Sequence, residues 1–213
     1  MQSGIDVSHF QSEIDWRKVQ RVGVSFVFVK ASEGLTVRDP MFHMNWEAAG
    51  EQGIVRGAYH FFRPQLDPVK QADFFLELLE DDPGELPPAL DLEVIGNVPA
   101  DDVIAAANRW MKIVGKELRC KPVLYTGSAF FRNTLKNSTA FASNPLWIAH
   151  YTVGPKPLVP SAWPQWTFWQ FSQQGKVFGI DGLVDLNAFN GTMADLDKLC
   201  IRKLAPMKIG TSA

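Results

Sequence analysis

The sequence predicts an α/β fold in which eight strands close into an incomplete TIM-like barrel, (β/α)5(β)3. Three observations predict it. Apolar runs that are hydrophobic on both faces, such as residues 24–31, are typical of parallel strands covered by helices. Strand and helix patterns alternate five times up to about residue 135. Three further strand patterns then follow with Pro- and Gly-rich connections and no amphipathic helix between them. An open doubly wound sheet is the alternative, but the Gly-rich phosphate fingerprints that it needs are absent.

The first five units each combine a strand with a helix. Pro87 and Pro88 mark the start of the fourth strand, because proline cannot donate to a ladder. Asp-Pro pairs at 39–40 and 67–68 are typical of helix starts, with the acid as cap and the proline in the first turn. The five predicted strand and helix pairs are 4–8 and 14–22, 24–31 and 39–52, 55–62 and 67–79, 87–94 and 100–118, and 121–127 and 129–135.

The last part of the chain is predicted to contain strands at 146–151, 167–172 and 184–189. A final helix over about 193–204 and a loose tail at 206–213 follow. At 213 residues and 46% hydrophobic content, the chain is long enough for one substantial core. We therefore expect residues 1–213 to form a single domain with its core over about 4–204.

Composition excludes several function classes. The formal net charge is −2 and no basic run occurs, so nucleic acid and anionic membranes are not expected partners. No apolar run reaches membrane-spanning length, and no signal peptide precedes the first strand, so export uses another route or a leader has been removed. The four histidines lack metal-site spacing, so neither a metal nor another cofactor is expected. Cys120 and Cys200 are predicted to be buried thiols, with a single bridge as the second interpretation.

Asp91 and Glu93 form the most informative pair of residues. In a strand, side chains two apart share a face, and their backbones lie ~6.6 Å apart. Two carboxylates this close repel each other unless one keeps a proton or a cation lies nearby. Such a pair suits an acid that works beside an ionised partner, although an isolated D-x-E pair is more often a solvated strand end.

Two further acids, Asp6 and Asp185, interrupt apolar strands, where a charge needs a reason. In a closed barrel the first and last strands are neighbours, and barrel active sites lie at the carboxyl ends of strands. We therefore expect these two acids to share one cavity with Asp91 and Glu93. The predicted aromatic lining of that cavity, which together with the acids indicates a glycosidase cleft, is Tyr59, Phe61, Tyr125, Trp147, Tyr151 and Trp169.

Charged and imidazole side chains near this cavity have simpler predicted roles. Lys30 and Glu33 are expected to pair with each other beside the mouth, outside the catalytic set. His60 and His150 alternate away from the cavity and are predicted to be core histidines.

Eight motifs in order carry a resemblance to a known family. They are GIDVSHFQ at 4–11, FVFVKASEG at 26–34, GAYHF at 57–61, LDLE at 90–93, YTG at 125–127, LWIAHY at 146–151, FWQFS at 168–172 and VDLNAF at 184–189. Over roughly residues 4 to 190 the chain resembles the glycoside hydrolase family 25 muramidases. The resemblance implies a lysozyme that hydrolyses the β-1,4 bond between N-acetylmuramic acid and N-acetylglucosamine in peptidoglycan. The enzyme would then act on the cell wall, in an extracellular or periplasmic setting, with a glycan strand as its partner and as a monomer.

The resemblance also assigns roles. Glu93 falls on the general acid of the family, and Asp91, Asp6 and Asp185 fall on its other active-site acids. Asp91 is either a nucleophile or the group that orients the acetamido oxygen of the substrate, and the D-x-E spacing favours the second role, with retention of configuration. We expect burial and repulsion from Asp91 and Asp6 to keep Glu93 protonated, and Asp185 to orient the cluster or polarise water.

Two other functions remain as alternatives. A chitinase-like or endo-N-acetylglucosaminidase barrel also has an Asp two residues before the general acid. However, chitinases carry a longer run of spaced acids before the general acid, and this run is missing from residues 85–90. A non-catalytic sugar-binding barrel is the third candidate, and the presence of every expected acid argues against it.

Overall fold

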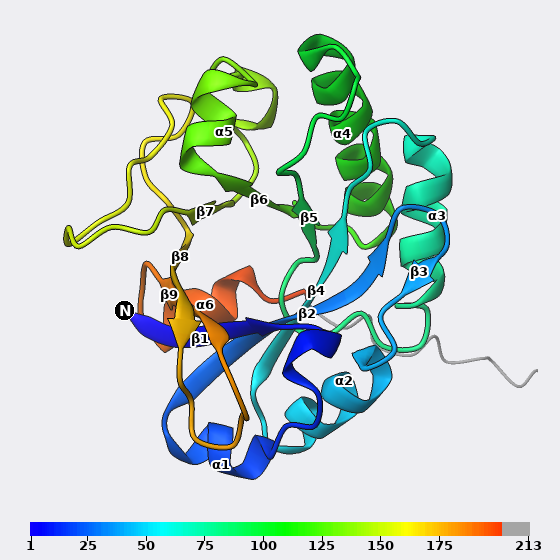
Figure 1. The fold of residues 1–213 in the computed structure, drawn as a ribbon. Helices are drawn as coiled ribbons and strands as arrows, with labels where there is room; N and C mark the ends of the chain where they lie inside the picture. Colours follow the sequence, from blue (N-terminus) through cyan, green and yellow to red (C-terminus); the bar gives the residue numbers. More distant parts are fainter. Residues whose placement is uncertain (202–213) are drawn as a thin grey trace, which may run out of the picture.

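A computed structural model describes residues 1–201 of the chain. Within them, eight strands close into a ring in the order β1, β2, β4, β5, β6, β7, β8, β9 and back to β1 (Figure 1). The ring consists of β1 (Gln2–Val7), β2 (Val24–Glu33), β4 (Val55–Phe61), β5 (Ala89–Asp91), β6 (Val123–Gly127), β7 (Leu146–Ala149), β8 (Phe168–Gly175) and β9 (Val184–Phe189). The predicted eight-stranded closure is confirmed. A short strand, β3 (Val37–Arg38), pairs with the end of β2 and lies outside the ring.

One strand of the ring runs in the opposite direction to the other seven. Neighbouring strands from β1 through β2, β4, β5, β6 and β7 to β8 run parallel. β9 runs antiparallel to both of its neighbours, β1 and β8. The start of β9 therefore lies at the same end of the barrel as the carboxyl ends of the other strands. The sequence analysis did not predict this reversal.

Helices cover part of the ring. α2, α3 and α4 lie together on one side of it in Figure 1, whereas the yellow segment between β7 and β8 is a loop. In the described part of the chain, no helix separates β7 from β8 or β8 from β9, as predicted. The α-helices are α1 (Trp16–Arg21), α2 (Phe42–Glu51), α3 (Pro68–Glu77), α4 (Ala100–Glu117), α5 (Ser128–Asn133) and α6 (Met193–Leu199), and the 3-10 helices are η1 (His9–Gln11) and η2 (Thr139–Phe141).

Only one of the two predicted Asp-Pro helix starts is correct. Asp67 caps α3, since its side chain accepts from the backbone N–H groups of Val69 and Lys70. Asp39 does not cap α2, which begins three residues later at Phe42. Its carboxylate instead accepts from Met41 N and from His9, which lies far away in sequence. The Asp39 carboxylate therefore binds His9, in a tertiary contact, and does not cap the helix as the local pattern predicts.

The barrel is filled by side chains at the end opposite to the mouth. Alternate strand residues point inward, and this interior cluster includes Phe26, Phe28 and Phe168, closed by Leu196 of α6. Glycines make the room, because a Cβ on Gly4 would lie 2.3 Å from the Phe26 ring. The residues between them, such as Val27, pack outward against the helices in a second cluster. The open part of the barrel is thus confined to the mouth.

Three predictions concern the ends of the chain and its cysteines. The predicted tail at 206–213 and the last residues of the predicted final helix lie outside the described residues, and α6 ends at Leu199. Cys120 and Cys200 are free thiols, but both are of intermediate burial, so the prediction that they are buried is wrong, and so is the alternative of a bridge between them. None of the helices in residues 1–201 combines the length and apolar character needed to cross a membrane.

Candidate active site

The four predicted acids come together at the mouth of the barrel. A cleft of about 210 Å³ is lined by Asp6, Asp91, Glu93 and Asp185, which derive from the beginning, middle and end of the chain. Lys30 is the cation among the described residues that line it. The other lining residues are Val7, Ser8, Phe10, Gln11, Tyr59, Phe61, Tyr125, Trp147 and Gln170.

Asp6 and Asp185 meet where the ring closes. They are direct register partners on the antiparallel strands β1 and β9. Asp6 is buried, and its Oδ2 accepts hydrogen bonds from Gln170 Nε2 at 2.9 Å and Asn187 Nδ2 at 2.7 Å. Burial, and next the charge of Asp185, raise the pKa of Asp6 well above its usual value, although the two amides oppose this. Burial also raises the pKa of Asp185. The pair therefore favours a state in which one of the two carboxyls keeps its proton.

Asp91 is the last residue of β5 and lies buried in the floor of the cleft. Burial raises its pKa well above the usual value, and the charges of Glu93 and Asp6 add to this, while Lys30 opposes it. Its Oδ1 atom is buried and has no hydrogen-bond partner among the described residues. A buried carboxylate oxygen without a donor is costly, so this atom is suited to accept a hydrogen bond from a bound molecule.

Glu93 reaches the cleft in a way that the sequence did not predict. The predicted strand continues to residue 94, but β5 ends at Asp91, so the two acids do not share the face of one strand. Leu92 still donates its N–H to Tyr125 O at 3.0 Å, and the chain then leaves the sheet. As a result Glu93 lies at the exposed rim, above the buried Asp91.

The electrostatic surroundings of Glu93 also differ from the prediction. Partial burial in the cleft raises its pKa, Lys30 and Arg63 oppose the rise, and Asp185 adds to it. The predicted contributors were Asp91 and Asp6. We expect a smaller shift than for Asp91, because the Glu93 side chain reaches solvent, which screens charges.

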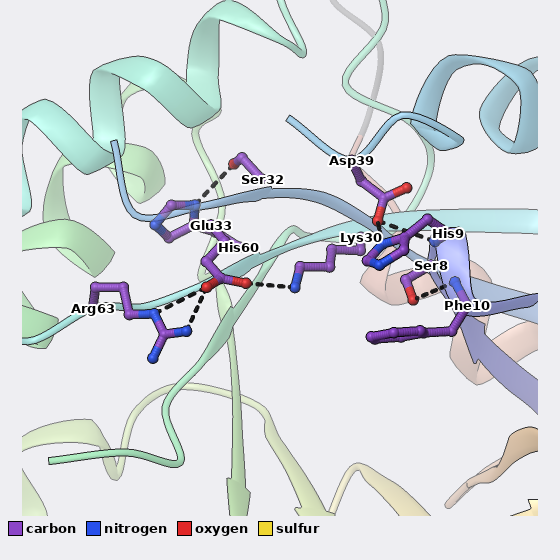
Figure 2. A network of polar contacts seen from close by, with 9 residues as sticks. All are labelled: Ser8, His9, Phe10, Lys30, Ser32, Glu33, Asp39, His60 and Arg63. Atoms are coloured by element: carbon purple, nitrogen blue, oxygen red, sulfur yellow. Dashed lines mark hydrogen bonds and ion pairs between the residues drawn. The ribbon is translucent and has the colours of Figure 1, made fainter. Parts of the chain in front are cut away.

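Lys30 belongs to a fixed network beside the acids (Figure 2). Its Nζ donates to Glu33 Oε2 at 2.8 Å, as predicted, and Arg63 binds the other oxygen of Glu33. Lys30 Nζ and the Arg63 guanidinium also lie 5.2 Å and 4.6 Å from the centre of the Phe61 ring. Burial would raise the pKa of Glu33, but the two cations outweigh it and the pKa is lowered. The Lys30 ammonium is therefore held at one place next to Asp91 and Glu93.

Five of the six predicted aromatic residues lie at the cleft or are hydrogen-bonded to it. Tyr59, Phe61, Tyr125 and Trp147 line it directly. Tyr151 is 49% exposed, and its hydroxyl donates to Gln170 Oε1 at 2.7 Å.

Trp169 does not lie at the cleft. It belongs to the outward-facing cluster, packs against Trp166 and donates its indole N–H to His150 O at 2.8 Å. Because successive residues of β8 alternate, Phe168 and Gln170 point into the barrel and Trp169 points out. The prediction that Trp169 lines the cavity is wrong for this reason.

The two histidines differ from each other. His60 is a core residue, as predicted: its ring lies within hydrogen-bond distance of Ser32 Oγ and Gln71 Oε1, and burial lowers its pKa to about 4. His150 is only partly buried, and its Nδ1 accepts from Leu158 N at 3.2 Å, so its prediction as a core residue is wrong.

The sequence analysis missed two amides that organise the site. Gln170 Oε1 accepts from the hydroxyls of Tyr125 and Tyr151 while its Nε2 donates to Asp6. Asn187 donates to Asp6 and accepts from Trp147 Nε1 at 2.7 Å. The available signal was a polar residue at an inward position of an apolar strand, since Asn187 lies two residues after Asp185. In residues 1–201, no group of three or more His, Cys, Asp or Glu is arranged to hold a metal ion.

The chain is similar to known proteins in sequence and in fold. The model of glycosyl hydrolases family 25 matches residues 5–180. The uncharacterized protein YegX of Escherichia coli K12 is 38% identical over 198 residues, which cover 91% of this chain and 71% of that protein. Lysozyme M1 of Streptomyces globisporus is 37% identical over 204 residues, with 91% and 69% covered. The crystal structure of the bacterial lysozyme from Streptomyces coelicolor superposes with a TM-score of 0.87 at 34% identity, covering 95% of this chain and 98% of that one.

Proposed function

Because this chain belongs to glycoside hydrolase family 25 and is a glycoside hydrolase, we propose that it is a lysozyme that cleaves peptidoglycan. The bond would be the β-1,4 bond between N-acetylmuramic acid and N-acetylglucosamine. One observation carries the proposal: four carboxylates from distant parts of the chain share one aromatic-lined cleft. Glycoside hydrolysis needs one carboxyl group that donates a proton and a second that supports charge at the anomeric carbon.

Glu93 is proposed as the general acid. Its place at the rim lets it reach the oxygen that links two sugar rings, and its raised pKa favours the protonated form. In the first step its proton passes to the leaving oxygen as the bond from that oxygen to the anomeric carbon breaks. The resulting carboxylate then takes a proton from water, which attacks the same carbon.

Asp91 is proposed to hold the acetamido group of the substrate. The buried Oδ1 atom without a partner supports this role, because an acetamido N–H would supply the missing donor. The acetamido oxygen would then attack the anomeric carbon from the face opposite to the leaving group. Water later displaces it, so the product retains its configuration. The role of direct nucleophile is the alternative.

For this reaction, Glu93 must be protonated while Asp91 is ionised. In the free protein, burial raises the pKa values of both Asp91 and Glu93. A bound sugar would separate the two, because an N–H donor would stabilise ionised Asp91 while the sugar would shield Glu93 from water. Asp6, held by Gln170 and Asn187, and its partner Asp185 would orient the cluster or polarise the attacking water.

Mass spectrometry of digested peptidoglycan tests the proposal. We expect fragments that end in reducing N-acetylmuramic acid, and we expect purified walls to clear faster than soluble chitin oligomers are cut. Fragments that end in reducing N-acetylglucosamine, or a preference for chitin, would favour the chitinase-like alternative. Binding to walls without release of reducing ends would favour a non-catalytic sugar-binding barrel.

The wider setting is proposed as well. The enzyme would act on the cell wall outside the cytoplasm, as a monomer whose residues 1–213 form a single catalytic (β/α)5(β)3 domain. In residues 1–201, a helix follows each of the first five strands of the ring and none separates the last three, which supports the barrel description.

A further inference from the structure

A short turn with an exposed aromatic ring lies at one end of the cleft. Immediately after β1, residues His9–Gln11 form η1, which Ser8 and Gln11 cap reciprocally. Ser8 Oγ accepts from Phe10 N at 3.3 Å, and Ser8 N donates to Gln11 Oε1 at 3.0 Å. Gln11 Nε2 also donates to Leu183 O in the loop before β9. The turn therefore follows the strand that carries Asp6 and is bonded to the loop that leads into the strand that carries Asp185.

A second anchor fixes the turn from the opposite side. The backbone N–H and ring Nδ1 of His9 bind Asp39 Oδ2 at 3.1 Å and 2.7 Å, and Asp39 is buried. Figure 2 shows the His9 ring between the Asp39 carboxylate and the Phe10 ring. The centres of the His9 and Phe10 rings lie 4.2 Å apart. His9 thus supports one side of Phe10.

Phe10 is 78% exposed and lines the cleft. A single exposed apolar side chain needs no explanation by itself, since folded proteins carry many. Phe178, at 63% exposed, is such a case, because it does not line the cleft. Phe10 differs from Phe178 because it lines the cleft that holds the acids.

We propose that Phe10 is a stacking platform for one hexosamine ring of the glycan strand, a binding subsite at the η1 end of the cleft. The inference rests on the proposed function. A β-1,4-linked hexosamine presents axial C–H groups on its ring faces, and these faces are apolar while its edges are polar. The acids and amides of the cleft can bind the edges only. An aromatic ring supplies the surface that the apolar face needs, because its own face is electron-rich and poorly hydrated.

The rigidity of the turn strengthens the platform. Ordering a mobile side chain upon binding costs free energy, and a ring that is already supported by His9 avoids part of that cost. A phenyl ring has no group that can donate or accept the proton of the reaction, so the subsite would add affinity for the glycan strand without taking part in bond cleavage.

Binding of soluble glycan strands from peptidoglycan tests the platform in a protein that cannot cleave them. Phe10→Ala is combined with Glu93→Gln, and binding of soluble glycan strands is measured by calorimetry. We expect about tenfold weaker binding than for Glu93→Gln alone. Phe10→Trp should restore the affinity and Phe10→Leu should not, because leucine is apolar but has no ring. Phe178→Ala in the same background is the matched control and should bind like its parent. Tm measurements verify that each variant is folded.

In the active enzyme, Phe10→Ala should raise KM for glycan strands more than it lowers kcat. Unchanged affinity of the Phe10→Ala protein would overturn the platform, as would full affinity of Phe10→Leu or an equal loss in Phe178→Ala. These outcomes are separate from a failure of the proposed function, which would be seen as absence of reducing-end muramic acid with the wild-type enzyme.

Discussion

The carboxyl groups of Asp6 and Asp185 face each other across the seam that closes the barrel, on strands that run in opposite directions. Because β9 is reversed, Asp185 lies near its start while Asp6 lies near the end of β1. The closure of the sheet and the assembly of the acidic cluster are thus the same structural event. Any change that shifts the β1 and β9 register would also separate these acids.

Replacement of Glu93 tests the proposed acid. Glu93→Gln should lower the rate of wall hydrolysis by ~100-fold or more, since an amide cannot donate a proton to the leaving oxygen. Stability should not fall, because the side chain lies at the exposed rim. Reducing-end release and Tm are the two measurements. Glu51→Gln, an exposed residue of α2, is the matched control and should be fully active. Wild-type activity of Glu93→Gln would remove the assignment.

Asp91 is tested by stereochemistry and by substitution. Proton NMR in the first minutes of hydrolysis should show the β-anomer of the product, because two displacements at one carbon restore its configuration. Asp91→Asn should lose ~100-fold in rate, since a neutral amide cannot stabilise positive charge on the acetamido group. Asp73→Asn, on the exposed side of α3, should retain its rate. An α-anomer as first product would contradict retention.

Crowding of acids predicts a pH dependence of stability. The pKa values of Asp6, Asp91, Glu93 and Asp185 are all raised in the folded protein, in each case by burial first. A raised carboxyl pKa adds stability that is complete below the unfolded value, ~3.9 for Asp, and that is lost as pH rises through the folded value. The contribution of these four acids to the free energy of unfolding should therefore decline as the pH rises above their unfolded pKa values and through their raised folded values.

Asp185→Asn should make that decline shallower and raise the free energy of unfolding at pH 8, while lowering activity. The gain should be ~1 kcal/mol or less, because Asp185 is partly exposed and solvent screens its charge. Urea unfolding at several pH values measures it. Asp181→Asn, an exposed acid in the loop before β9, serves as control and should leave the slope unchanged. A variant with the slope of the wild type would refute the predicted crowding at Asp185.

Lys30 is expected to set the alkaline limit of activity. Its charge lowers the pKa values of Asp91 and Glu93, against the burial that raises them. Lys30→Met should therefore let Glu93 keep its proton to higher pH and move the alkaline limb of the kcat/KM profile upward. Glu33 would still be held by Arg63. Lys18→Met, which removes an exposed lysine paired with Asp15, is the control. A limb that stays in place or moves to lower pH would exclude this role.

Local sequence pattern predicted most elements well. The predicted strand at 184–189 has the bounds of β9, and the predicted helix at 100–118 ends one residue beyond α4. Both segments have a clear hydrophobic period, of two residues in the strand and about 3.6 in the helix, so local signals dominate. The errors lie where a distant residue competes for a side chain or a strand ends early. His9 takes Asp39 from its expected cap, and β5 ends at Asp91 although the alternating pattern continues to residue 94.

By itself, the sequence determined which acids would meet, because a charged residue inside an apolar strand is costly unless the fold supplies it with polar partners or solvent. It also determined the closed sheet, through five alternating strand and helix patterns followed by three strands. Tertiary structure alone decided how the four acids differ in burial, in hydrogen-bond partners and in pKa. The direction of β9, the amides of Gln170 and Asn187, and the depth of Asp91 below Glu93 all depend on contacts between residues far apart in sequence. The pKa of a carboxyl group responds to its surrounding solvent and charges, and these exist only once the barrel is closed.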